Sequence, residues 1–263
     1  MKPGCIWRTL RGAVCLFVAL YMLVPIAIVV VISFSSGQFL SFPPPGFSLQ
    51  WYRALNDPAW TSSLATSVEV MIPAALLSTC LGLGAALMLR REGLPGAPLI
   101  RGILLSPLVI PVIITGAAFY SVFRPLGLHG TVLGLIVAHT VLCIPYALTT
   151  ITSSLAMVDW RIAQASASLG ARPFTTFRRV TFPSISSGVI SSFLFSLVVS
   201  FDEVVVSMFV SGPDARPVTV QMWSNIRGDV DPTIAALASV LFVFALLILL
   251  LEAIFGRGEA TEQ

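Results

Sequence analysis

Long apolar segments alternate with short polar connections along the whole chain. A helix needs roughly 20 mostly apolar residues to cross a bilayer core of about 30 Å. Six segments reach this length, at residues 12–34, 63–89, 102–123, 131–151, 184–210 and 232–255. The pattern predicts an all-α membrane protein with six transmembrane helices. We expect residues 12–34 to be an uncleaved first span, because this run is longer than the apolar region of a signal peptide.

The composition agrees with a membrane protein, since 56% of the residues are apolar and 10% are charged, against roughly 25% charged in soluble domains. A net charge of +3 gives no indication of nucleic-acid binding. Basic residues in short loops mark the cytoplasmic side of a membrane protein. With the N-terminus inside, only four of the 15 basic residues fall outside, namely Arg53, Arg124, Arg216 and Arg227. This asymmetry predicts that both termini are cytoplasmic.

The polar connections divide the chain unequally. Residues 1–60 are expected to form the first transmembrane helix and an outer loop rich in proline. Residues 61–256 are expected to hold the other five helices together with a long cytoplasmic loop at 152–183. Residues 257–263 would then form a cytoplasmic tail.

The chain lacks the residues of a self-sufficient ATPase. Lys2 is its only lysine, so it has no Walker lysine, and no glycine-rich phosphate loop opens a helix. His129 and His139 are too far apart to form a helical metal pair. These absences predict a non-catalytic transport subunit, and they also permit a self-sufficient channel or a proton-coupled carrier. A membrane-embedded enzyme would need a clustered polar site, which we do not find in the sequence.

The loop at 152–183 contains a stretch suited to a short helix at the membrane surface. Small residues at positions 163, 165, 166 and 167 allow close approach to another backbone. Asp159 can cap the start of this helix, Gly170 can end it in a left-handed conformation, and Pro173 fixes the exit. Such a helix can seat in a cleft of a soluble partner. An ordinary amphipathic loop is the alternative.

The spacing in this loop resembles a motif of ABC importer permeases, in which Glu-Ala-Ala, three residues, Gly and nine residues precede Ile-x-Leu-Pro. The corresponding stretch here contains Gln164, Ala165, Ser166, Gly170, Arg178, Arg179 and Pro183. Gln164 and Ser166 depart from the usual Glu and Ala. The resemblance implies a type I ABC importer permease fold and a loop that docks on a separate ATPase.

Three acidic residues, Glu69, Asp202 and Glu203, fall inside apolar segments, where each costs about 2.5–3.5 kcal/mol near a helix centre. Polar residues of the fifth segment recur at helical spacing and are expected to share one face. They are Ser192, Ser196, Ser200, Glu203 and Ser207. This stripe predicts a cation-favouring path, to which Phe201 or Tyr120 would add cation–π attraction. The alternatives are pairing with an arginine of a partner and close helix packing through the serines.

Three further stretches carry a second resemblance, and they are Ser200-Phe201-Asp202-Glu203, Gly212-Pro213 and Gln221-Met222-Trp223. They resemble the polyamine (spermidine/putrescine) type of ABC importer permease, and in particular its second membrane subunit. The same subgroup contains carriers of 4-aminobutyrate, opines and aminophosphonates, so the cargo stays open among these amino compounds. The resemblance implies a multi-pass protein of the bacterial inner membrane with no cofactor of its own.

The same resemblance implies four partners besides the cargo. They are the lipid bilayer, a second homologous permease in a heterodimer, a periplasmic substrate-binding protein and a dimer of ATP-binding subunits. ATP and Mg would be bound by that partner ATPase, and no nucleic acid is involved.

Overall fold

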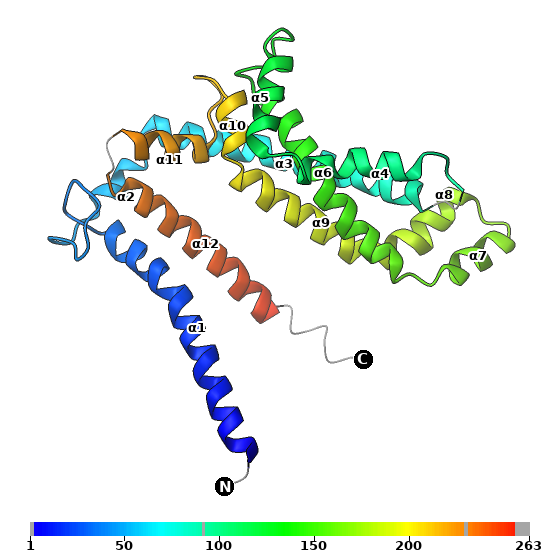
Figure 1. Ribbon diagram of the computed structural model, residues 1–263, viewed down its shortest axis with the longest axis horizontal. Coiled ribbons are helices and arrows are strands. Elements are labelled where there is room, and N and C mark those ends of the chain that lie inside the picture. Colours follow the sequence, from blue (N-terminus) through cyan, green and yellow to red (C-terminus); the bar gives the residue numbers. More distant parts are fainter. Residues whose placement is uncertain (1–2, 91–92, 229–230, 256–263) are drawn as a thin grey trace. The chain divides into compact units, whose positions relative to one another are not determined.

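The computed structural model describes residues 3–90, 93–228 and 231–255 (Figure 1). Regular secondary structure in these ranges is helical, apart from one isolated β-bridge between Ser35 and Phe47. The all-α prediction is therefore confirmed. Internal contacts divide the chain into two units, which we call the terminal unit (Met1–Thr61 with Met222–Gln263) and the central unit (Ser62–Gln221).

The terminal unit is built on the first and last helices. α1 (Pro3–Ser33) packs along α12 (Thr233–Phe255), and Ile26 and Phe242 line the groove between them. This grouping differs from the expected division near residue 61, which kept the last helix with the preceding four. The predicted tail at 257–263 lies outside the described residues.

A short helix, α2 (Gln50–Ala54), folds back against the end of α1. The Tyr52 hydroxyl shares a hydrogen bond of 2.7 Å with Ser33 Oγ, and the Trp51 indole N–H donates to the Ser35 carbonyl at 2.8 Å. These bonds satisfy polar groups at the end of an otherwise apolar helix. The outer loop is thus tied to α1 by side chains.

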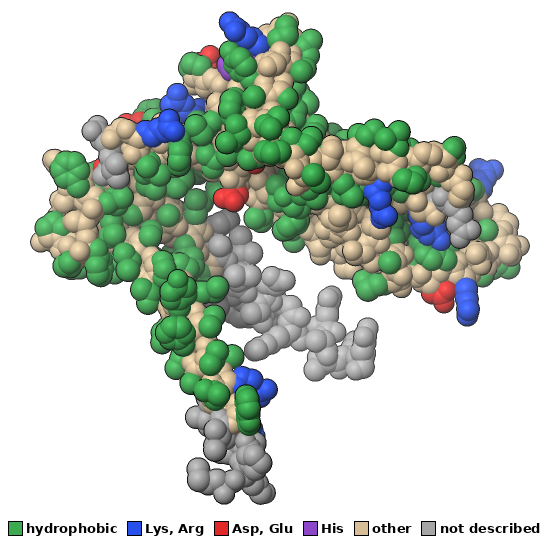
Figure 2. Space-filling view, in the orientation of Figure 1, with side chains coloured by type: hydrophobic (Ala, Val, Ile, Leu, Met, Phe, Trp, Pro, Cys, Tyr) green, Lys and Arg blue, Asp and Glu red, His purple; other side chains and the backbone are tan. Residues whose placement is uncertain are grey.

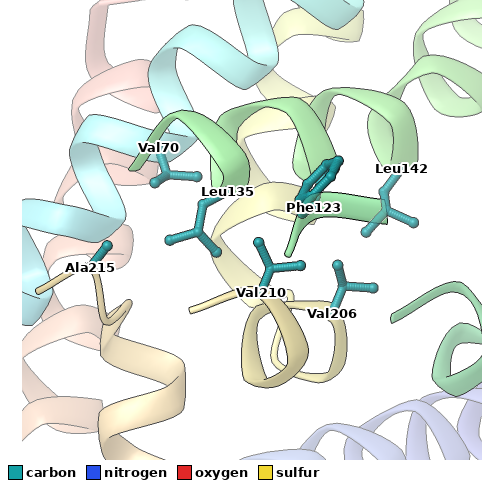
Figure 3. Close-up of a cluster of buried hydrophobic side chains, with 8 residues drawn as sticks. Val70, Phe123, Leu135, Leu142, Val206, Val210 and Ala215 are labelled. Atoms are coloured by element: carbon teal, nitrogen blue, oxygen red, sulfur yellow. The ribbon is translucent and has the colours of Figure 1, made fainter. Parts of the chain in front are cut away.

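The central unit contains the elements that position the predicted sites. They are α3 (Pro58–Leu89, from residue 62 on), α4 (Ala97–Leu105), η1 (Ser106–Leu108), α5 (Val112–Phe123), α6 (Val132–Ala156), α7 (Trp160–Ser168), α8 (Pro173–Thr176), the π-helical turn η2 (Phe177–Thr181), α9 (Phe182–Asp202), α10 (Val205–Val210) and the start of α11 (Val218–Arg227). α6 packs along α9, and α5 packs against α10. Figure 3 shows Val206 and Val210 of α10 in one buried cluster with Leu135 and Phe123.

The third apolar segment is not the single helix expected over 102–123. The axis turns by 101° between Ala97–Leu108 and Val112–Phe123. Pro107 and Pro111 explain the bend, because proline lacks a backbone N–H and its ring clashes with the carbonyl four residues earlier. The bend changes the shape of the segment, which is still apolar along its length.

Within the described residues, four helices are long and apolar enough to cross a membrane, and the bent α4–α5 pair would make a fifth. The four are Leu10–Ser33, Pro58–Leu89, Val132–Ala156 and Pro173–Asp202. The sixth expected span corresponds to α12, of which Thr233–Val243 forms a shorter apolar stretch. The count of six spans and the cytoplasmic position of both termini stay predictions.

The predicted spans differ in the share of their surface that is buried by the rest of the chain. None of the apolar window of Leu10–Ser33 is buried, whereas 56% of the window of Val132–Ala156 is buried. A helix that is apolar all round, and whose neighbours bury none of its apolar window, keeps much of its surface available for contact with lipid. α1 therefore has the surface of a lipid-exposed helix, and α6 has that of a helix enclosed by others.

Candidate functional site

Helix α7 begins and ends as the sequence predicts. The Asp159 carboxylate accepts a hydrogen bond from the Arg161 backbone N–H at 3.0 Å and so caps the helix start. Gly170 follows the helix with a φ of 80°, which residues with a side chain rarely adopt. Its backbone N–H donates to the Ala167 carbonyl at 2.9 Å. Both predicted ends of this helix are confirmed.

The two short helices of the loop are tied together by a pair of hydroxyls. Ser166 Oγ and Thr176 Oγ1 share a hydrogen bond of 3.0 Å between α7 and α8. The Ser166 carbonyl also accepts from the Ala171 N–H at 3.2 Å. The serine that departs from the importer motif therefore joins α7 to α8, which an alanine side chain cannot do.

A groove runs along α7 on the side of α3 and η2. Its lining residues are Leu87, Arg90, Trp160, Ala163, Gln164, Ala167, Ala171, Pro173, Thr176, Phe177 and Thr181. The Arg90 guanidinium lies 2.9 Å from the centre of the Trp160 ring. This cation–π contact fixes the start of α7 to the end of α3.

The tip of the loop leaves large apolar side chains uncovered by the chain itself. Met157 is 82% exposed, Leu169 is 89% exposed and Phe174 is 72% exposed. These three side chains were not among the predicted docking residues. Of the predicted ones, six are exposed, namely Gln164, Ala165, Gly170, Arg178, Arg179 and Pro183. Figure 2 shows basic side chains (blue) at the end of the central unit that carries α7 and α8. Exposed apolar groups framed by charges suit docking on a folded partner.

Helix α9 ends at two adjacent acids, Asp202 and Glu203, which we call the acid pair. Asp202 is exposed, and Glu203 is half-buried in an extended conformation with φ −73° and ψ 108°. The Val206 N–H donates to Glu203 Oε1 at 2.8 Å, at the start of α10. Glu203 thus satisfies a backbone donor at a helix start, while Asp202 presents its carboxylate at the surface of the chain.

The predicted single polar face of the fifth segment is wrong in its geometry, because α9 stops at Asp202. Ser192, Ser196 and Ser200 are buried on α9, which packs along α6, whereas Ser207 belongs to α10. Among the residues that the structure describes, the hydroxyls of Ser192 and Ser196 have no hydrogen-bond partner. In this chain the three serines of α9 lie at a helix–helix contact, which small side chains allow to be close.

His139 of α6 reaches both sides of the break between α9 and α10. Its Nδ1 lies 2.8 Å from Ser200 Oγ, and its Nε2 lies 2.9 Å from Ser207 Oγ. The side chain is only 2% exposed. His139 is therefore a buried histidine whose two ring nitrogens both face hydroxyls. The two serine partners were missed, because they lie 61 and 68 residues further along the chain.

The remaining predicted path residues are dispersed over the central unit. Glu69 is exposed on α3, and Phe201 is half-buried beside the acid pair in sequence. Tyr120 has other partners near the end of α5, where its ring lies 5.1 Å from the His129 ring and 5.9 Å from the Arg124 guanidinium. The described contacts join neither Glu69 nor Tyr120 to the acid pair.

Metal chemistry finds no support in the residues that the structure describes. No three His, Cys, Asp or Glu side chains among them lie together as a metal site would need. The expectation that this chain carries no cofactor of its own stays a prediction.

Comparison with known proteins decides the family. The family described as "Binding-protein-dependent transport system inner membrane component" matches residues 78–259. The chain belongs to this family. PotC, the spermidine/putrescine transport system permease protein of Escherichia coli (strain K12), is 30% identical over 255 residues, which cover 97% of this chain and 96% of PotC. PotI, the putrescine transport system permease protein of the same strain, is 32% identical over 230 residues, covering 84% and 81% of the two chains.

Solved structures agree on the fold of this inner membrane component. A chain of a bacterial ABC transporter involved in the import of the acidic polysaccharide alginate matches it with a TM-score of 0.71, covering 99% of both chains at 14% identity. At this identity the likeness shows the fold alone. The protein is therefore an integral membrane permease of an importer with the fold of an ABC transporter membrane subunit.

Proposed function

We propose that this inner membrane component carries polyamines such as spermidine and putrescine across the bacterial inner membrane. PotC and PotI, to which it is similar over most of their length, are named for these cargoes. The observation that carries the proposal is the exposed carboxylate of Asp202 at the end of an apolar helix. An acid at such a place is costly to keep, so a compensating cation is expected.

A polyamine supplies such a cation, because it carries several ammonium groups separated by apolar carbon chains. Two unit charges about 4 Å apart attract by roughly 4 kcal/mol at an effective dielectric constant of 20. Much of this attraction offsets the hydration that both ions lose, so the net gain is smaller. The acid pair can therefore offset part of the hydration that a passing cation loses. Because the net attraction is small, the cation can also leave, as transport requires.

The direct test is uptake of labelled spermidine, putrescine and 4-aminobutyrate in cells with and without this chain. We expect polyamine uptake to depend on the chain, and Asp202→Asn to lower spermidine uptake more than that of any zwitterion the complex carries. Asp214→Asn is the matched control, because Asp214 is also exposed but lies in a loop. If uptake of 4-aminobutyrate, an opine or an aminophosphonate depends on this chain and uptake of polyamines does not, the proposed cargo is wrong and that compound takes its place.

The proposal includes the source of energy. The loop at 152–183 docks on a separate dimer of ATP-binding subunits, which hold ATP and Mg, and this chain itself catalyses no reaction. The exposed apolar and basic tip of the loop supports such docking. We expect Gly170→Arg to abolish cargo-stimulated ATP hydrolysis in the purified complex without removing the protein from the membrane.

A matched control for this variant is Gly127→Arg. Gly127 also has a left-handed backbone, with φ 69°, and an open neighbourhood, but it lies on the predicted outer side. Equal loss of stimulation in both variants would trace the effect to backbone strain and would contradict docking through Gly170. Uptake without any ATPase would favour a self-sufficient channel or a proton-coupled carrier.

The proposed arrangement has six spans, with a transport core at 61–256 that pairs with a second homologous permease. Its outer loops face a periplasmic substrate-binding protein, and both termini are cytoplasmic. Reporter fusions can test these sides. Fusions at Asn56, Gly127 and Asp214 should report the outside, and fusions at Gly93, Arg172 and Gln263 the inside. An external Arg172 would contradict the docking of the loop.

A further inference from the structure

The break between α9 and α10 frees backbone groups that a continuous helix would pair. In the bilayer core such groups must find partners within the protein. The Glu203 carbonyl accepts two hydrogen bonds from hydroxyls, one from Ser207 Oγ at 2.8 Å and one from Thr219 Oγ1 at 3.3 Å. Together with the Val206 N–H on the Glu203 carboxylate, these bonds place Glu203 at the centre of a small polar network.

His139 completes this network from a third helix, and its proton can be assigned from the network. Because the single hydroxyl proton of Ser207 goes to the Glu203 carbonyl, Ser207 Oγ accepts from His139, so Nε2 carries a proton. In the neutral imidazole Nδ1 is then the acceptor, and it receives the Ser200 hydroxyl. The chain of bonds runs in one direction, from Ser200 through His139 and Ser207 to Glu203.

We propose that His139 is a positioning residue for transport, which clamps α9 to α10 across the break and thereby sets the orientation of the acid pair. Ser200 holds the last turn of α9, and Ser207 holds α10, while α6 supplies a fixed support for both. Without the clamp, α10 can pivot about the extended residue Glu203. The role of the acid pair in cargo transport rests on the proposed function, whereas the clamp between α9 and α10 does not.

The geometric part can be measured without any transport assay. Spin labels at Val198 on α9 and Met208 on α10, both exposed, report the angle across the break. They would be placed in the full-length chain within the assembled transporter in nanodiscs, with Cys5, Cys15 and Cys80 replaced by alanine. The unmodified network should give one narrow distance distribution. Ser207→Ala should broaden it about twofold, because α10 then samples a second orientation.

Two further variants make this measurement specific. Ser196→Ala is the matched control, because it removes a buried hydroxyl of α9 that bonds to none of the described residues, so the distribution should not change. His139→Leu should broaden the distribution as Ser207→Ala does. His139→Gln, whose amide can still reach Ser207, should restore part of the narrow distribution. A distribution that stays narrow in Ser207→Ala overturns the clamp.

The transport part uses a double-mutant cycle. We expect Ser207→Ala to lower spermidine uptake by about two- to tenfold, the factor set by one buried hydrogen bond. In a background carrying both Asp202→Asn and Glu203→Gln the same change should lower uptake no further, because no acid of the pair is left to orient. Additive losses would overturn the positioning role, even with broadened distances. If the intact chain carries no polyamine, the proposed function fails, while the distance measurement still decides the clamp.

Discussion

The two interrupted segments of the central unit, α4–α5 and α9–α10, leave the straight helix through different chemistry. The first is bent by 101° around Pro107 and Pro111, whose rings oppose a continuous helix whatever surrounds them. The second breaks at Glu203 in a stretch without proline or glycine. There other elements bond to both sides of the break, since His139 of α6 contacts Ser200 and Ser207, and Thr219 of α11 donates to the Glu203 carbonyl.

The difference separates a bend that is local from one that is tertiary. A local bend keeps its shape when neighbours move, so it can act as a rigid corner. A tertiary break exists only while its partners are in place, so its angle can respond to them. The acid pair lies at the tertiary break between α9 and α10. We infer that the angle at this break, and with it the orientation of the two acids, is more adjustable than the bend between α4 and α5.

The largest effect is expected from removing both prolines of the first bend. In a helix interior, proline costs about 3 kcal/mol, so Pro107→Ala with Pro111→Ala should let residues 106–112 approach helical geometry. Labels at the exposed residues Ile103 and Val122 should move apart as the pair straightens. An unchanged distance would show that packing, and not proline, holds this bend, and the contrast between the two breaks would disappear.

A smaller effect is expected where α5 meets α10. A side chain added at Gly116 would come within 2.5 Å of the Phe209 ring, whereas one at Gly102 on α4 would meet nothing within 4 Å. Gly116→Val should therefore lower the free energy of unfolding by about 1–3 kcal/mol through overpacking. Thermal unfolding in detergent would measure this, with Gly102→Val as the control. Equal stability of the two variants would contradict the described contact between α5 and α10.

Removing the Glu203 carboxylate should have a more modest effect. Glu203→Ala deletes the acceptor for the Val206 N–H at the start of α10 and should cost about 1 kcal/mol, as loss of a helix cap does. Glu203→Gln keeps an acceptor oxygen at the same place and should recover most of this stability. Chemical denaturation of the three proteins compares them. If Gln is as destabilising as Ala, the carboxylate does not act through this hydrogen bond.

The smallest effect is expected from Ser192 and Ser196 of α9, whose hydroxyls have no hydrogen-bond partner in the described part of the chain. Ser192→Ala and Ser196→Ala remove buried polar atoms that make no hydrogen bond with any described residue, so the free energy of unfolding should stay within about 0.5 kcal/mol or rise slightly. Ser200→Ala should instead destabilise by about 1 kcal/mol, because it takes a hydroxyl from His139. The same denaturation assay ranks the three serines, and identical values for all would argue against the His139 network.

How much of this could be predicted from the sequence depends on whether the cause is local. The cap at Asp159 and the left-handed Gly170 were predicted correctly, because both act on their immediate neighbours. Pro107 and Pro111 were equally visible, yet the length of the apolar run led us to expect a single helix. The break at Glu203 was beyond sequence reasoning, because His139, which bonds to the serines on either side of the break, lies 61 and 68 residues before them. The pairing of α1 with α12 is likewise a contact between distant parts of the chain.

The separation of His139 from its partners has a consequence for biosynthesis. The imidazole is made 61 residues before Ser200 and 68 residues before Ser207. At about 5–20 residues per second, translation leaves it without either hydroxyl for roughly 3–14 s. An unpaired polar ring is unfavourable in lipid, so nascent α6 is best retained at the insertion machinery until α9 and α10 emerge. The uncovered apolar surface of α1 imposes no such delay, and this helix can enter the lipid as soon as it is complete.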